Sequence, residues 1–157
     1  MELDWKTLVE TGWGLKKDEN RLIDYFEGIH NQHPSARAKF ELANVLDYLG
    51  RESEAIPLYQ EAISEGLSTE YHVYALVQMA SSLRNVGRAN EAVEVLTKAE
   101  KKFPEFASLS LFLGLCLHSD GRHTDALKTV MTAMLRHVHS EDLIRYAGIT
   151  NYIEDIK

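Results

Sequence analysis

The chain has 157 residues, enough for one domain with a buried core, and 45% of them are hydrophobic. Its 17 basic and 24 acidic residues leave a net charge of −7, and a negative surface repels phosphate groups, so neither nucleic acid nor an anionic membrane is expected as a partner. A single cysteine, the absence of a secretory pattern at the N-terminus and a longest apolar run of 11 residues together predict a cytoplasmic protein.

The first 35 residues predict a short helix followed by a longer one. The short helix is expected to break around Gly12 and Gly14. The second is expected to run from about Asp18 to Asn31, with apolar residues on one face, and to end before Pro34 because the residue before proline disfavours the helical conformation. We interpret residues 1–35 as a degenerate helical hairpin that covers the start of a repeat array.

A motif of twelve residues then occurs in three related copies. It reads NVLDYLGRESEA from Asn44, SSLRNVGRANEA from Ser81 and LCLHSDGRHTDA from Leu115. The glycines of the three copies are 37 and 34 residues apart. A repeat with a period in this range is typical of stacked helical hairpins, which build an extended surface.

The three repeats occupy residues 36–69, 70–106 and 107–139. Small residues recur where two helices would have to approach closely. These residues are Ala43, Ala80, Gly114, Ala55, Ala92, Ala126, Ala62, Ala99 and Ala133. The second helix of each repeat is expected to begin at an N-cap of a favourable type, namely Ser53, Asn90 and Thr124. The middle repeat is longer by the three residues 70–72, which predicts an extra helical turn.

Residues 140–157 are predicted to form one terminal helix that begins after Ser140. Its apolar residues cover more than one face, since Ile149 lies about 120° around the helix from Leu143. One neighbouring hairpin can hardly cover both flanks, and soluble monomers tend to avoid exposed apolar patches. We therefore expect a homodimer with Ile149, Tyr152 and Ile156 in or beside its interface.

The turn glycines, the pattern of small and large residues and Pro104 near one repeat end resemble the tetratricopeptide repeat, most of all its small stand-alone bacterial group 5. Lys39 and Ser110 depart from the pattern, because the family often has a large apolar residue at that position. The resemblance implies an all-α fold: a right-handed α-solenoid of three stacked hairpins, with the N-terminal hairpin and a C-terminal capping helix, in one domain over residues 1–157. It also implies a protein-binding role without catalysis.

The resemblance further implies which residues bind a partner, because four positions on the first helix of each hairpin face a concave surface in this family. Here the candidates are Arg37, Phe40, Asn44, Asp47, Tyr74, Val77, Ser81, Arg84, Leu111, Leu115 and His118. The carboxylate clamp of some family members is not expected, because Phe40, Ser108 and Phe112 stand where basic or polar members of the family would be expected. The mixed lining suits an amphipathic helix or an extended segment, although Leu111 and Leu115 are equally consistent with burial under the terminal helix.

The residues show no pattern that predicts catalysis, a cofactor or a metal site. Cys116 and His118 lie about 200° apart around a helix and do not converge as zinc ligands must, and Cys116 is expected to be an inert core thiol. Arg51, Arg88 and Arg122, which follow the turn glycines, are expected to be solvated. We therefore expect a non-catalytic module that binds a protein segment. The alternative is a receptor for a small peptide or metabolite, which a pocket of convergent polar groups would favour.

Overall fold

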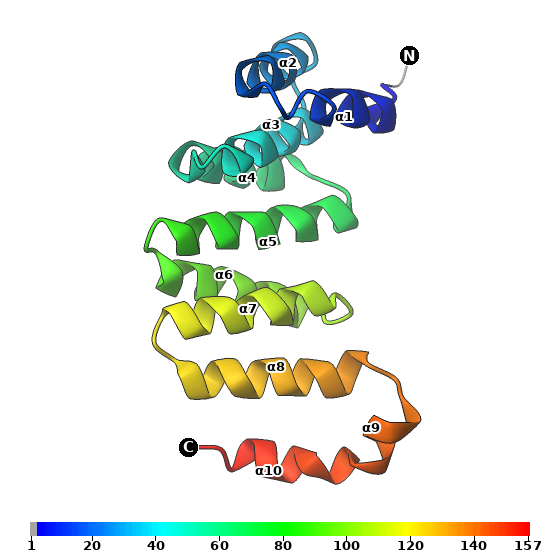
Figure 1. Cartoon of the computed structure of the whole chain (residues 1–157), viewed down its shortest axis with the longest axis vertical. Coiled ribbons are helices and arrows are strands. Elements are labelled where there is room, and N and C mark those ends of the chain that lie inside the picture. The colour runs from blue at the N-terminus through cyan, green and yellow to red at the C-terminus, as the bar shows by residue number, and fades with distance from the viewer. Residues whose placement is uncertain (1–2) are drawn as a thin grey trace. The chain divides into compact units, whose positions relative to one another are not determined.

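A computed structural model describes residues 3–157, and all regular secondary structure within that range is helical. The chain forms two units, one through Ser82 and the other from Leu83 to Lys157. The first unit contains the helices α1 (Trp5–Trp13), α2 (Glu19–Gln32), α3 (Ala36–Tyr48), α4 (Glu52–Glu65) and most of α5 (Thr69–Asn85) (Figure 1). No helix in the described range is both long and apolar enough to cross a membrane.

The second unit consists of three long helices and a short terminal segment. Its helices are α6 (Ala89–Lys102), α7 (Ala107–Ser119), α8 (His123–His137), α9 (Glu141–Arg145), the 3-10 helix η1 (Ala147–Ile149) and α10 (Thr150–Glu154). Helix α7 packs on both α6 and α8, and α10 packs on α8.

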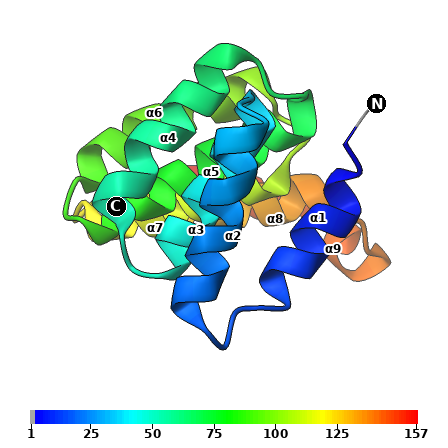
Figure 2. The ribbon, with the colours of Figure 1, turned by 90° about the horizontal axis from the view of Figure 1, so that it is seen from above.

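The N-terminal hairpin is formed by α1 and α2, and α2 packs against α3 (Figure 2). The side chains of Asp4 and Asp18 cap the two helices by accepting hydrogen bonds from backbone amides of the first turn. Gly12 lies in the contact between the helices, because a Cβ atom there would stand 2.4 Å from Cε2 of Phe26. The predicted pair of helices is confirmed, with α2 beginning and ending one residue later than expected.

The predicted register of the repeats is confirmed by burial. Eight of the nine small residues are buried, and Ala133 is half-buried. Gly50, Gly87 and Gly121 connect the two helices of each repeat and have φ angles of 70°, 81° and 79°. Side chains with a Cβ atom rarely adopt this left-handed conformation, which accounts for the repeated glycine at the turn.

The prediction of N-caps at Ser53, Asn90 and Thr124 is wrong. Helices α4, α6 and α8 each begin two residues earlier than predicted, and the residue that follows each turn glycine occupies the cap position without a side-chain cap bond. These arginines are also not simply solvated. Each pairs with the acidic residue three positions later: Arg51 with Glu54 at 2.7 Å, Arg88 with Glu91 at 2.6 Å, and Arg122 with Asp125 at 2.9 Å. The ion pair holds the acid in the first helical turn, where a negative charge also suits the helix dipole.

The two family departures at Lys39 and Ser110 are explained by polar partners on a neighbouring helix. Lys39 Nζ forms ion pairs with Glu61, at 2.7 Å, and with Glu65, both on α4. The hydroxyl of Ser110 donates to Glu100 on α6. The expected extra turn is also confirmed, because α5 has 17 residues whereas α3 and α7 have 13 each.

The prediction of one continuous terminal helix is wrong. Ser140 caps α9 as expected, but α9 ends at Arg145, and a 3-10 turn separates it from α10. The amides of Tyr146 and Ile149 bond to carbonyls three residues earlier. Gly148 lies in this turn, and glycine is a poor helix former. The angle of about 120° between Leu143 and Ile149 assumed an unbroken helix and therefore does not apply.

Candidate partner-binding surfaces

Arg37 lies in the centre of an aromatic and acidic cluster in the first unit. Its Cζ atom is 3.5 Å from the ring centroid of Tyr71 and 5.5 Å from that of Trp5. Its Nε donates to Oε1 of Glu41 over 2.6 Å. The guanidinium is therefore held by a cation–π contact and an ion pair within its own unit.

A buried hydrogen-bond chain continues from Glu41 along α3. Glu41 accepts a second, longer bond of 3.4 Å from Nδ2 of Asn44, and the hydroxyl of Tyr59 donates to Oδ1 of Asn44 over 2.8 Å. Burial raises the pKa of Glu41, although the charge of Arg37 acts in the opposite direction. Burial also raises the pKa of Tyr59 well above its usual value. Asn44, a predicted binding residue, thus has both ends of its amide engaged.

Asp47 is the last predicted binding residue on α3 and joins that helix to α5. The Ser82 hydroxyl donates to its Oδ1 over 2.6 Å. Burial of this half-buried carboxyl raises its pKa, and the nearby charge of Glu52 adds to the effect. The polar side chains of α3 therefore bond mainly to groups of the first unit.

Phe40 and Val77 were predicted to line an open surface, but both are buried, with 4% and 6% of their surface exposed. The ring of Phe40 packs against Tyr59 and, at 5.7 Å between centroids, against Tyr71. Tyr71 belongs to the three inserted residues, so the extra turn of α5 covers Phe40. Tyr74 is exposed and donates to Glu70 over 2.7 Å, and Ser81 is half-buried.

The second unit has an open apolar groove between α7 and α8. Leu111 and Leu115 are 52% and 46% exposed, so the terminal segment does not cover them. The groove, called here the α7–α8 groove, is lined by Leu111, Gly114, Leu115, His118, His123, Ala126, Leu127 and Val130. A Cβ atom on Gly114 would lie 2.4 Å from Cγ2 of Val130, which shows how closely the two helices approach at the groove floor.

Sequence reasoning did not identify the α8 wall of this groove. Leu127, Val130 and Met134 are exposed and follow one another at the i, i+3 and i+7 spacing of a helix face. Only the first helices of the hairpins were considered as binding elements. The apolar periodicity on the second helix of the last repeat would have indicated an uncovered face.

Two histidines lie at one end of the α7–α8 groove. The Nδ1 atoms of His118 and His123 are 3.0 Å apart, and their ring centroids are 4.6 Å apart. Arg84, at the end of α5 and also in the second unit, donates to Oδ1 of Asn85 over 3.0 Å. Its charge lowers the pKa of the Cys116 thiol on α7, against the larger effect of burial, which raises that pKa.

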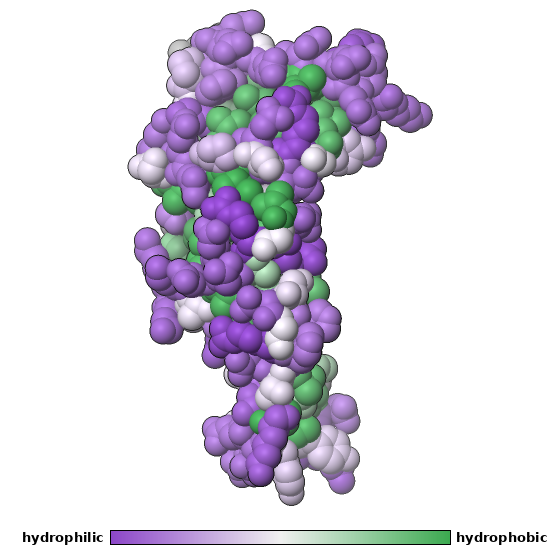
Figure 3. All heavy atoms as spheres, turned by 90° about the vertical axis from the view of Figure 1, so that its left-hand side faces the viewer, coloured by the Kyte–Doolittle hydropathy of each residue, from purple (hydrophilic) through white to green (hydrophobic). Residues whose placement is uncertain are grey.

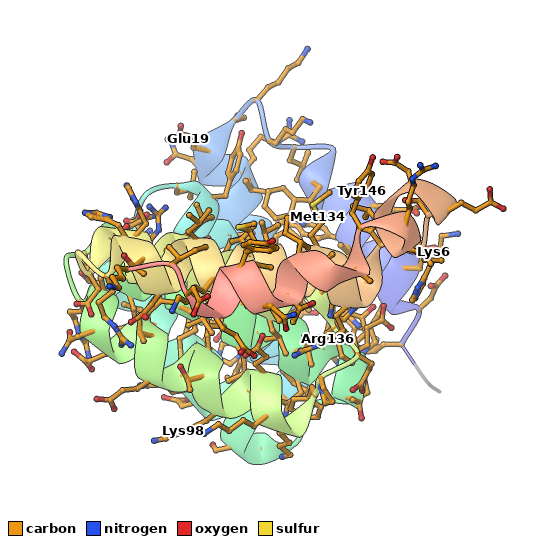
Figure 4. The ribbon with its side chains drawn as sticks, turned by 90° about the horizontal axis from the view of Figure 1, so that it is seen from below. Lys6, Glu19, Lys98, Met134, Arg136 and Tyr146 are labelled. Atoms are coloured by element: carbon orange, nitrogen blue, oxygen red, sulfur yellow. The ribbon has the colours of Figure 1, made fainter. Side chains whose placement is uncertain are left out.

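A second exposed apolar surface lies at the end of the chain. It comprises Tyr146, Ile149 and Tyr152, and is called here the C-terminal patch; Tyr152 is 75% exposed. Ile156 was predicted on the same flank but is half-buried, whereas Ile153 is buried. Figure 3 shows hydrophobic side chains between polar ones at the level of α8 and α10, and Figure 4 shows Met134 and Tyr146 on the same side of the unit.

The comparisons with known proteins identify the family. The family model described as "Tetratrico peptide repeat" matches residues 36–155. The chain belongs to the tetratricopeptide repeat family. No curated protein shows detectable sequence similarity to it. The match extends beyond the third repeat into the terminal segment.

Solved structures support the tetratricopeptide repeat fold. YrrB, described as a TPR protein with an unusual peptide-binding site, superimposes with a TM-score of 0.67 at 20% identity over 87% of this chain and 69% of its own. MamA superimposes with a TM-score of 0.66 at 20% identity, over 83% of this chain and 77% of its own. A MamA fragment from Desulfovibrio magneticus RS-1 superimposes with a TM-score of 0.65 at 14% identity, over 96% of this chain and 85% of its own. At these identities the likeness concerns the fold.

Within this tetratricopeptide repeat chain, Cys116 is fully buried in α7, and burial raises the pKa of its thiol. A raised pKa keeps a thiol in its unreactive protonated form. The residues from 3 to 157 contain no cluster of three or more histidine, cysteine or acidic side chains placed to hold a metal ion.

Proposed function

We propose that the chain is a non-catalytic protein-interaction module that binds a segment of another protein at the α7–α8 groove. The observation that carries this proposal is the exposure of Leu111 and Leu115, at 52% and 46%, next to the exposed apolar wall of α8. Apolar grooves between helices are a common way to recognise peptide segments. The peptide-binding site described for YrrB supports the same kind of role here.

The other predicted concave-face residues contribute less to this role. Arg37, Asn44 and Asp47 are bonded to neighbours in the first unit, so a partner would have to replace existing bonds. Tyr74 and Ser81 are the better accessible candidates there. The same internal bonding gives little support to a receptor for a small peptide or metabolite, because the polar groups of α3 already satisfy one another.

The proposal is tested by placing charge in the groove. Leu111→Asp with Leu115→Asp should abolish capture of partner proteins from the cells that make this chain, because an incoming apolar side chain would meet two carboxylates. The helical circular dichroism should stay unchanged, since both side chains are exposed. Tyr48→Ala is the matched control, because Tyr48 is an exposed aromatic residue of the first unit that was not predicted to bind a partner. Capture of the same partners by the double variant would contradict the proposal.

A homodimer is a second part of the proposal, favoured by the exposure of Tyr146, Ile149 and Tyr152. A second copy would bury the C-terminal patch, and two-fold pairing is the commonest symmetry for such contacts. Light scattering coupled to size exclusion should show a dimer for the wild type and a folded monomer for Ile149→Glu with Tyr152→Glu. A wild-type monomer at micromolar concentration would contradict it. We place the protein in the cytoplasm, where the single thiol of the chain, that of Cys116, would stay reduced.

A further inference from the structure

The walls of the α7–α8 groove are two helices, and this limits what the groove can hold. Leu111 and Leu115 are four residues apart on α7, while Leu127 and Val130 are three apart on α8, so both apolar rows run along helix axes. The backbone amides and carbonyls of a helix interior are bonded within the helix. An extended segment would therefore find no hydrogen-bond partners for its backbone on these walls. The backbone amides and carbonyls of a bound helix need none, because they are already bonded within that helix.

The histidine pair gives one end of the groove a specific chemistry. With the Nδ1 atoms 3.0 Å apart, one Nδ1–H donates and the other Nδ1 accepts, and the accepting ring then carries its proton on Nε2. If the pair takes up one more proton, the Nδ1 bond is retained and both rings carry Nε2–H. The singly protonated pair thus has one positive charge and two N–H donors that take no part in the internal bond, and either donor can bind a carboxylate oxygen.

The other ionisable groups around this end are few. They are Asp120 at the end of α7 and the Arg122–Asp125 ion pair at the start of α8. Farther along α8, Lys128 donates to the backbone carbonyl of Glu154. The groove walls themselves consist of aliphatic residues, glycine and alanine. Among the residues that line this groove, the histidine pair is therefore the group that can recognise charge.

We propose that the groove holds an amphipathic α-helix of another protein, with its apolar stripe between α7 and α8 and an Asp or Glu side chain against His118 and His123. This inference rests on the proposed function and adds the class of partner. The carboxylate sets the register of the helix, because it can reach the histidines only at one end of the groove. A charged histidine pair attracts the carboxylate more strongly than a neutral pair does, so binding strengthens as the pH falls.

The test uses a displayed library of helical peptides with Leu, Ile or Phe at i, i+4 and i+7 on one face and random residues elsewhere. Selection on the wild-type protein at about pH 6 should enrich Asp or Glu at one fixed position beyond the apolar stripe. In a selected peptide, replacing that acid by its amide should weaken binding about five- to tenfold. The same loss should appear on His118→Gln with His123→Gln, with no further loss when both changes are combined. His139→Gln, at another exposed histidine, is the matched control and should bind normally.

The outcomes separate this inference from the proposed function. Selected helices that lose binding to Leu115→Asp but show no acidic preference and no pH dependence would overturn the inference and leave the function standing. Failure to select any peptide sensitive to Leu115→Asp would overturn both. If Leu115→Asp instead converts a dimer to a monomer, a second copy fills the groove and the inference is wrong. A charge swap gives an independent check, since His123→Glu should bind a selected peptide better when its acid is changed to Lys.

Discussion

The hairpins α3–α4 and α7–α8 are copies of the same repeat, yet they treat corresponding positions differently. Phe40 and Leu111 occupy one equivalent position, and Tyr59 and Val130 another. Phe40 and Tyr59 are buried, whereas Leu111 and Val130 are exposed. In the first hairpin, aromatic rings and the inserted turn of α5 close the surface. Hairpins of the same repeat fold can therefore have a covered or an exposed face, depending on side-chain size at a few repeat positions.

The two units also differ in charge. Residues 1–82 contain 7 basic and 14 acidic residues, whereas residues 83–157 contain 10 of each, so the first unit carries the whole net charge of −7. Repulsion of phosphate groups by a negative surface is therefore expected of the first unit alone. The second unit combines neutral charge with exposed apolar side chains, which is the composition expected of a docking surface.

The largest difference between the hairpins should appear when the equivalent side chains are removed. Tyr59→Ala should lower the free energy of unfolding by about 3–5 kcal/mol, because it leaves a cavity in the core and removes the bond to Asn44. Val130→Ala should lower it by about 1 kcal/mol or less, because that side chain is partly in water. Urea unfolding of both variants decides the matter, and equal losses would show that the two faces are not different.

Overpacking should have the next largest effect. Ala92 is fully buried where α6 meets its neighbours, so Ala92→Leu should destabilise the fold by about 1–3 kcal/mol. Ala107→Leu, at an exposed position of α7, serves as the control and should change stability by about 0.5 kcal/mol or less. Unfolding midpoints that do not differ between the two variants would refute the register assigned to the repeats.

The smallest effect concerns the buried acids of the first unit. The pKa of Asp47 is higher in the folded state than in the unfolded chain, so the folded state binds more protons at pH values between these two pKa values. The free energy of unfolding therefore falls as the pH rises through that interval. Asp47→Asn keeps an acceptor for the Ser82 hydroxyl and removes this cost. The variant should be more stable than wild type at about pH 7, with the gain vanishing at about pH 3. Asp24→Asn, at an exposed site, is the control, and a gain independent of pH would contradict the account.

Periodicity predicted the repeats, the turn glycines and the extra turn of α5, because these follow from local conformation and from small residues at regular intervals. It did not predict that Phe40 is covered, since this depends on Tyr71, which is 31 residues later and reaches Phe40 only in the folded unit. Nor did it find the histidine pair, in which two side chains from α7 and α8 meet across the turn between these helices. The break at Tyr146 was missed because apolar periodicity outweighed the helix-breaking tendency of Gly148.

The central claim is that partners bind the open face of the second unit and not the sealed face of the first. A photo-crosslinking amino acid placed at Leu115, and separately at Tyr74, tests it in the cells that produce the protein, because both side chains are exposed. The account predicts crosslinks to another protein from Leu115, lost when Leu111→Asp is added, and little product from Tyr74. Crosslinks from Tyr74 alone, or from Leu115 only to a second copy of this chain, would contradict it.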